Sequence, residues 1–169
     1  MDNGRWADLF CDRIYGIVSM EHGNGRSVEE QAIGMLEGGI RIIQYREKRR
    51  AKCVRLEECR RLRVLTRERG AVFIVNDDVD VALECDADGV HVGQDDLPVS
   101  EVRRLAGPGR IVGLSTHSVS QLEAAQESGA DYIGVGPVYP TRTKDNPDPV
   151  VGLELVSRAA RHSRLPFVA

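Results

Sequence analysis

The chain has 169 residues, of which 41% are hydrophobic and 29% are charged, a composition typical of one globular domain. Its formal net charge of -3 and its isoelectric point near 5.8 argue against a broad surface for nucleic acid or for a membrane. No apolar run approaches the roughly 20 residues of a membrane span, and the N-terminus lacks the charged-then-apolar layout of a signal peptide. We therefore expect a cytoplasmic protein. The four cysteines form no C-x-x-C pair and have no histidine at zinc-finger spacing, which argues against disulfides and structural zinc.

Short apolar runs alternate with longer amphipathic segments along the whole chain. The predicted strands are 15–18, 40–45, 71–75, 89–92, 111–114, 132–135 and 166–169, and the predicted helices are 27–37, 52–69, 79–85, 98–105, 119–128 and 153–161. Ser27 and Glu30 form a candidate capping box at the first of these helices. Repeated β-α units indicate a parallel sheet. Their even spacing, with no G-x-G-x-x-G after the first strand, favours a (β/α)8 TIM barrel over a dinucleotide-binding sheet, in one domain covering 1–169.

The number of predicted strands is smaller than this architecture requires. A closed barrel has eight strands and roughly 200 or more residues, whereas the predicted strands end with LPFVA at 165–169. We therefore expect an α/β TIM barrel truncated after about the seventh strand. Residues 1–14 are expected to form a short helix under the barrel rather than a replacement strand. Unpaired outer strands would favour self-association and poor activity, which an extension of roughly 35 to 45 residues should correct.

The segment QYREK, 44–48, ends the second predicted strand and carries an unusual set of polar side chains. Alternate residues of a strand share a face, so Gln44, Arg46 and Lys48 are predicted to point to the same side. Two cations and an amide at a strand end suggest a grip for an anion, most simply a phosphate. The alternative is a solvent-exposed charge run, which the basic residues that follow at 49–52 favour.

Acidic clusters follow the third and fourth predicted strands. They are NDD at 76–78 and QDD at 94–96, and the carboxyl ends of barrel strands are where active sites form. One carboxylate from each cluster, Asp77 and Asp96, would suit Mg²⁺, which takes one or two carboxylates together with substrate phosphates. The alternative is that Asp77 or Asp78 caps the next helix and that Asp96 caps the following one. Both interpretations are compatible, because each tandem pair leaves one acid for each role.

A proline-punctuated loop follows the sixth predicted strand, in IGVGPVYPTRTK at 133–144. Thr141, Thr143 and Lys144 offer hydroxyls and an ammonium, groups that hold a phosphate without a helix N-terminus. An ordinary surface loop is the alternative interpretation. The fifth strand ends in GLSTH at 113–117.

Histidines give a weaker signal. His117 has no carboxylate or nucleophile identifiable as its partner, and a hydrogen-bonded structural role is the simpler interpretation. His91 receives the same interpretation, although its alternation with two valines predicts that it points away from them.

Several multi-residue segments agree, in order and spacing, with one enzyme family. QYREK, NDDVDVALECDADGVHVGQDDLP, GLSTH and GADYIGVGPVYPTRTK together resemble thiamine phosphate synthases over nearly the whole chain. The resemblance implies a β/α barrel that joins a hydroxymethylpyrimidine diphosphate to a thiazole phosphate, with Mg²⁺, giving thiamine monophosphate and pyrophosphate. Its partners would be these small molecules, with neither nucleic acid nor a membrane.

The resemblance also implies roles for individual residues. The pyrimidine diphosphate would be bound by Gln44, Tyr45, Arg46, Glu47, Lys48, Asn76, Ser115 and Lys144, the Mg²⁺ by Asp77 and Asp96, and the thiazole phosphate by Thr141, Arg142 and Thr143. The catalytic groups would be Arg46, Lys48, Ser115 and Lys144.

The implied chemistry agrees with a site rich in cations and carboxylates. Pyrophosphate leaves a benzylic-type carbon, the aminopyrimidine delocalises the resulting cation, and the thiazole nitrogen attacks with its own lone pair. No general base is needed, so catalysis would rest on neutralising the leaving group and on holding the thiazole in line.

Two other functions remain open at this point. A thiazole tautomerase shares the barrel but has no need of the diphosphate and Mg²⁺ groups, whose presence here counts against it. A noncatalytic phosphate-binding or regulatory protein is the other candidate. The short C-terminus supports it, because the family's remaining thiazole phosphate contacts lie in glycine-rich loops after strands seven and eight.

Overall fold

The computed structural model describes residues 14–141 and 148–169. Its centre is one parallel sheet in which seven strands follow each other in sequence order. The strands are β1 (Tyr15–Val18), β2 (Ile42–Tyr45), β3 (Val72–Asn76), β4 (Gly89–Val92), β5 (Ile111–Thr116), β6 (Tyr132–Val135) and β7 (Phe167–Val168). The helices are α2 (Val28–Glu37), α3 (Lys52–Glu68), α4 (Val79–Glu84), α5 (Val99–Ala106), α6 (Val119–Ala125) and α7 (Gly152–His162).

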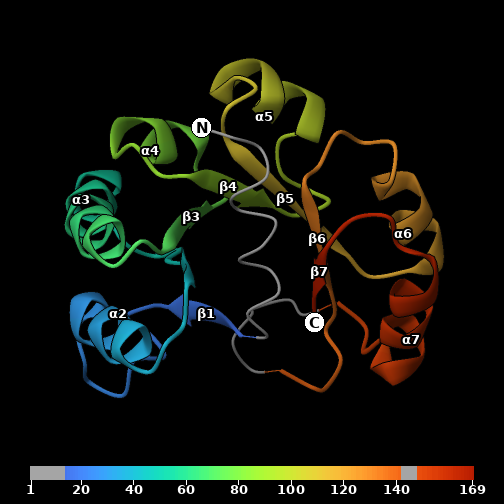
Figure 1. Cartoon of the computed structure of the whole chain (residues 1–169), viewed down its shortest axis with the longest axis horizontal. Coiled ribbons are helices and arrows are strands. Elements are labelled where there is room, and N and C mark those ends of the chain that lie inside the picture. The colour runs from blue at the N-terminus through green and yellow to red at the C-terminus, as the bar shows by residue number, and fades with distance from the viewer. Residues whose placement is uncertain (1–13, 142–147) are drawn as a thin grey trace.

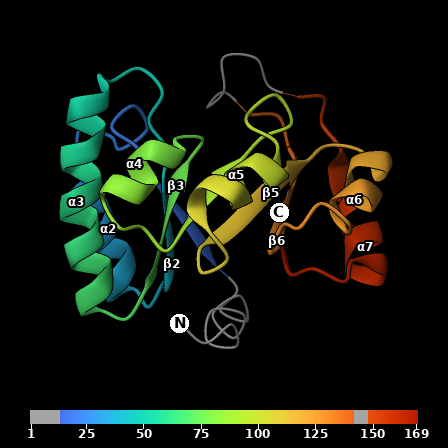
Figure 2. The ribbon, with the colours of Figure 1, turned by 90° about the horizontal axis from the view of Figure 1, so that it is seen from above.

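The sheet curves, and its helices all lie on the outer side (Figure 1). Seen from above, α2 and α3 lie at one end of this arc and α6 and α7 at the other (Figure 2). In the described residues β1 pairs only with β2 and β7 only with β6, so the barrel is open between these two strands. The predicted fold class, a TIM barrel carried as far as its seventh strand, is confirmed.

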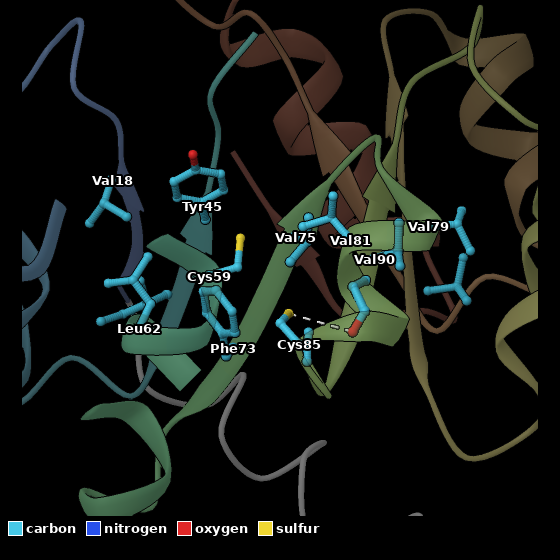
Figure 3. Packing of buried hydrophobic residues seen from close by; sticks show 14 of the residues in the cluster. Val18, Tyr45, Cys59, Leu62, Phe73, Val75, Val79, Val81, Cys85 and Val90 are labelled. Atoms are coloured by element: carbon cyan, nitrogen blue, oxygen red, sulfur yellow. Dashed lines mark hydrogen bonds between the residues drawn. The ribbon is translucent and has the colours of Figure 1, made fainter. Parts of the chain in front are cut away.

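Two hydrophobic layers follow from the two-residue period of the strands. The larger lies between the sheet and the helices and includes Val18, Phe73 and Val90 of the strands and Leu62 of α3 (Figure 3). The smaller lines the inside of the arc and contains Ile42, Val72, Ile74, Ile111 and Tyr132. Burial on both faces explains why these parallel strands read as continuous apolar runs in the sequence.

The predicted elements are present, and their ends differ by a few residues for local reasons. The Ser27 capping box is confirmed, with the Ser27 Oγ accepting from the Glu30 backbone and the Glu30 carboxylate accepting from the Ser27 backbone. The second strand starts later than predicted because the N–H of Ile40 still bonds the Met35 carbonyl at the end of α2. Helix α6 ends at Ala125, since the next three N–H groups bond carbonyls only three residues back.

Two remaining expectations concern the chain outside the barrel elements. The helix predicted near the N-terminus falls almost wholly on residues 1–13, which lie outside the described residues. None of the described helices is both long enough and apolar enough to cross a membrane.

Candidate active site

A cavity of about 450 Å³ opens where the strands end, inside the arc of the sheet. Strands β1 to β7, or the residues just after them, all contribute to its lining. Of the residues assigned to the site from the sequence, the cavity brings together Gln44, Arg46, Lys48, Asn76, Asp77, Asp96, Ser115 and Thr141. It therefore gathers side chains from segments almost 100 residues apart, as the carboxyl ends of barrel strands allow.

Other residues assigned from the sequence do not line this cavity. Tyr45 is buried on the helix side of β2, where its hydroxyl donates to Glu58 at 2.6 Å. Glu47 points the same way and accepts from the backbone N–H of Met20 at 3.0 Å. Both follow the strand period, which puts them opposite the cavity-facing residues. Arg142, Thr143 and Lys144 lie outside the described residues.

The cationic side of the cavity comes from the end of β2. Arg46 is half-buried, and the exposed Lys48 places its Nζ 3.2 Å from the Asp77 carboxylate. Gln44 lies deeper, only 4% exposed, and its Nε2 donates to the Tyr15 hydroxyl. Arg49, from the alternative charge-run interpretation, forms an ion pair with a glutamate outside the cavity lining. The strand end therefore separates cavity-facing polar groups from ordinary surface charges.

The two predicted metal ligands form a carboxylate pair across the ends of β3 and β4. Burial raises the pKa of the Asp77 carboxyl from 3.8 to about 6, and hydrogen bonding with Asp96 and repulsion from its charge add to this shift. Lys48 opposes the shift as a nearby cation. The Asp96 carboxylate is oriented by the Gly93 N–H, which donates to its Oδ2 at 2.7 Å. Two carboxylates this close resist simultaneous ionisation unless a cation joins them.

The capping alternative does not account for this pair. The N-cap of α4 is Asp78, whose carboxylate forms an ion pair with Arg55 and makes no cap hydrogen bond. The N-cap of α5 is Pro98. Asp77 and Asp96 therefore cap neither helix. No group of three or more His, Cys, Asp or Glu side chains converges among the described residues, so a cation held here needs further oxygen ligands.

The floor of the cavity is a hydrogen-bonded group of His91, Ser115 and two tyrosines, and sequence reasoning missed the tyrosines. The Tyr15 and Tyr132 hydroxyls lie 2.7 Å apart, and the Tyr132 hydroxyl lies 2.8 Å from Nδ1 of His91. The other nitrogen of this imidazole, Nε2, lies 2.9 Å from Oγ of Ser115. Burial raises the pKa of both tyrosine hydroxyls above its ordinary value, so both keep their protons.

A pattern of glycines was the signal for this floor. Strand register places Gly113 directly between His91 and Tyr132, as their partner on both sides. A Cβ at Gly113 would overlap the Tyr132 ring and Nδ1 of His91. One at Gly134 would lie 3.3 Å from Cε1 of His91. Glycines at inward positions of neighbouring strands thus indicate that large side chains from flanking strands meet across them.

His117 has partners that the sequence did not reveal. Its Nε2 lies 3.2 Å from the Asp148 carboxylate, and its Nδ1 contacts the carbonyl oxygen of Gly136. The imidazole therefore connects the end of β5 to the segment after β6. Both nitrogens are thus engaged by protein groups, but the side chain also lines the cavity, so its structural role stays a prediction.

Comparisons with known proteins agree with this architecture. The family model described as thiamine monophosphate synthase matches residues 14–169. The chain is 53% identical over 156 residues to the thiamine-phosphate synthase of Pelotomaculum thermopropionicum, covering 92% of this chain and 72% of that protein. A second relative, the thiamine-phosphate synthase of Caldicellulosiruptor saccharolyticus, is 51% identical over 156 residues, with 92% and 71% covered.

A solved structure shows the same arrangement in space. Thiamine phosphate pyrophosphorylase from Pyrococcus furiosus superposes with a TM-score of 0.81 at 38% identity, covering 92% of this chain and 72% of that one. Both the sequence matches and the fold extend over all the cavity-forming strands. This chain belongs to the thiamine monophosphate synthase family.

Proposed function

We propose that the chain is a transferase that joins a hydroxymethylpyrimidine diphosphate to a thiazole phosphate, forming thiamine monophosphate and releasing pyrophosphate. The observation that carries this proposal is the meeting of two cations with a carboxylate pair in one cavity. Arg46, Lys48, Asp77 and Asp96 all line it, and Lys48 lies 3.2 Å from the Asp77 carboxylate. The relatives' activity gives the substrate class.

The cavity suits a substrate that is planar at one end and anionic at the other. Its floor is formed by Tyr15, Gln44 and His91, and Gly134, which has no side chain, lines the cavity next to the His91 ring. An aminopyrimidine ring fits such a floor, because aromatic and amide groups accept a flat heterocycle with polar edges. Charged groups lie farther along the strands, toward solvent. The diphosphate would therefore point outward to the rim, and the carbon that bears it would lie between floor and rim.

The carboxylate pair fits Mg²⁺ by its donor chemistry. Asp77 and Asp96 offer hard oxygen ligands, and the raised pKa of the Asp77 carboxyl reflects negative charge that a cation would relieve. Two carboxylates leave the remaining octahedral positions for water and diphosphate oxygens, the usual arrangement for Mg²⁺ at a phosphate substrate. When bound, the ion would neutralise the charge on the leaving pyrophosphate.

The chain's own residues would act by electrostatics and orientation. Arg46 and Lys48 face the developing charge of the pyrophosphate, which is greatest as the carbon–oxygen bond breaks. Lys48 also contacts Asp77, so the same ammonium would be held against both the diphosphate and the carboxylate pair. Asn76 at the end of β3 and Ser115 in β5 offer neutral hydrogen-bond donors to the same cavity. No proton has to be removed from either substrate, because the thiazole nitrogen attacks with a free lone pair.

The thiazole phosphate would enter from the side of β6. Thr141 lines the cavity there, and Arg142 and Thr143 follow it in the sequence. Two hydroxyls and a guanidinium in this order suit a phosphate monoester. Approach from this side would present the thiazole nitrogen to the carbon between the floor and the rim, with pyrophosphate departing toward Lys48.

Pyrophosphate release from the two substrates, measured with and without Mg²⁺, tests the proposal. We expect release only when both substrates and Mg²⁺ are present. Substitution Arg46→Met should suppress it, whereas Arg60→Met, on the exposed face of α3, should not. Release from the pyrimidine diphosphate that does not depend on the thiazole phosphate would indicate a hydrolase instead. Binding without release would indicate a phosphate-binding protein.

A further inference from the structure

The pair formed by His91 and Ser115 invites two opposite interpretations. An imidazole nitrogen 2.9 Å from a serine hydroxyl has the spacing of a base beside a nucleophile. The same spacing is found when the imidazole N–H donates to the serine oxygen, and the serine proton then points away from the imidazole. The choice between these interpretations depends on whether Nδ1 or Nε2 of His91 carries the proton. The hydrogen-bond partner of Nδ1 decides this.

The partner of the other nitrogen belongs to a chain of hydrogen bonds that starts at Gln44. The amide Nε2 of Gln44 donates to the Tyr15 hydroxyl at 2.9 Å, so the Tyr15 oxygen accepts this hydrogen bond. The Tyr15 proton is then donated to the Tyr132 oxygen, 2.7 Å away. Tyr132 donates in turn to Nδ1 of His91, at 2.8 Å. Each tyrosine keeps its proton because burial raises its pKa, so each passes on one hydrogen bond and accepts one.

This direction leaves His91 with its proton on Nε2. The imidazole donates to Ser115, and the serine oxygen is the acceptor. Among the described residues no acceptor other than this imidazole lies within hydrogen-bond distance of the Ser115 hydroxyl. Its proton is therefore available to the cavity that the side chain lines.

The geometry shows that this chain of side chains is built into the barrel. Gln44, Tyr132 and His91 are all buried, at 4%, 0% and 8% exposure. Gly113 lies between His91 and Tyr132 in the strand register, and any side chain there would occupy the space in which they meet. Tyr132 also contacts both partner rings, with centroids 5.9 Å from Tyr15 and 5.4 Å from His91.

We propose that this relay, from Gln44 through Tyr15, Tyr132 and His91 to Ser115, fixes the direction of the serine hydroxyl and presents it as a hydrogen-bond donor to the departing diphosphate. Tyr15 and Tyr132 are positioning residues that act through His91. The same relay prevents His91 from acting as a base, so Ser115 is a donor and not a nucleophile. The catalytic consequence rests on the proposed function, whereas the tautomer of His91 does not.

Nitrogen-15 NMR of the imidazole groups in the whole chain tests the relay directly. Long-range correlations separate protonated from unprotonated ring nitrogens, and His91→Asn assigns its signal among the four histidines. We expect Nε2 of His91 to be protonated and Nδ1 unprotonated. Gln44→Glu should move the His91 proton to Nδ1 above the pKa of the introduced carboxyl. A carboxylate can only accept from Tyr15, and this reverses the direction of each following hydrogen bond as far as His91. A protonated Nδ1 in the unsubstituted chain would overturn the proposal without any variant.

Kinetics test the consequence for the reaction. Tyr132→Phe should mix the His91 tautomers and lower kcat by about tenfold or more while KM for the pyrimidine diphosphate changes little, because the lost hydrogen bond matters most as charge develops. Tyr139→Phe, at an exposed tyrosine, is the matched control. A Tyr132→Phe variant that keeps a single tautomer and normal kcat would overturn the relay. If the unsubstituted chain shows the expected tautomer of His91 but no turnover, that result would contradict the proposed function and, with it, the catalytic role of Ser115.

Discussion

Replacing Asp77 with asparagine should stabilise the folded chain and weaken its Mg²⁺-dependent binding of pyrophosphate. Both effects have one cause, because the carboxylate sits beside Asp96 where a negative charge is unfavourable without a cation. Asparagine keeps the size of the side chain and tolerates the left-handed backbone at this position, where φ is 63°. The substitution therefore changes the charge with little change in backbone strain.

The magnitude follows from the pKa of the Asp77 carboxyl, which rises from 3.8 to about 6 on folding. Each pK unit corresponds to ~1.4 kcal/mol, so the ionised carboxylate would cost the folded state at most about 3 kcal/mol. The side chain is 29% exposed, and solvent screening reduces this to about 1 to 2 kcal/mol. The favourable contact with Lys48 is already included, since it lowers the same pKa.

The dependence on pH identifies the cause. The Asp77 carboxyl has a higher pKa in the folded chain than in the unfolded chain, so the folded chain binds its proton more tightly. The stability that this proton contributes is fully present below the unfolded pKa of 3.8. It is lost as the pH rises through about 6. The gain from Asp77→Asn should therefore be largest at about pH 8 and should vanish toward about pH 4.

Urea unfolding followed by far-UV circular dichroism at both pH values measures this gain. Asp95→Asn is the control, because it removes the same charge from the exposed neighbour of Asp96 and should change stability by less than about 0.5 kcal/mol. Calorimetric titration with pyrophosphate in Mg²⁺ completes the test. Equal stability of Asp77→Asn and the unsubstituted chain at about pH 8, or a gain that persists in acid, would refute the carboxylate-pair argument.

Further substitutions separate the other parts of the site. Asp96→Asn keeps an oxygen for the hydrogen bond from the Gly93 N–H, so the variant should fold normally. Because it lacks the carboxylate, calorimetry should show weaker Mg²⁺-dependent pyrophosphate binding, and unchanged affinity would make this carboxylate structural. Lys144→Ala should lower kcat as well as raise KM in steady-state assays, and an effect on KM alone would indicate binding without charge stabilisation. Gly113→Ala should destabilise folding by about 1 to 3 kcal/mol in urea, because the new methyl group forces His91 and Tyr132 apart, and an unchanged midpoint would contradict that contact.

Much of the fold was predictable because its signals are local. The strands read as short apolar runs buried on both faces, and the Ser27 capping box is visible in four consecutive residues. The cationic strand end was predictable for the same reason, since the two-residue period alone puts Arg46 and Lys48 on one face. That period also shows why Tyr45 and Glu47 lie away from the cavity, although the family resemblance had grouped them with their neighbours.

The relay was not predictable from the same signals because each member is unremarkable alone. Tyr15 and Tyr132 are 117 residues apart, and their meeting depends on the curvature of the sheet as well as on strand pairing. Only the register of β4, β5 and β6 shows that a glycine separates His91 from Tyr132. Sequence reasoning therefore identified the charged groups at the rim together with Gln44 and Ser115, and it missed the two tyrosines that connect them through His91.

Rim and floor face different physical demands, which explains this division. Groups at the rim bind a solvated, highly charged diphosphate, so they must be charged and partly exposed, and such residues are conspicuous at strand ends. Groups at the floor are buried, where an unpaired polar atom is costly, so each hydroxyl and ring nitrogen must be matched by a neighbour. When every hydrogen bond of a buried neutral network runs in one direction, the network orients its last hydroxyl without carrying any net charge. A site that releases pyrophosphate can thus combine strong charges at its mouth with a hydroxyl at Ser115 that the neutral floor orients.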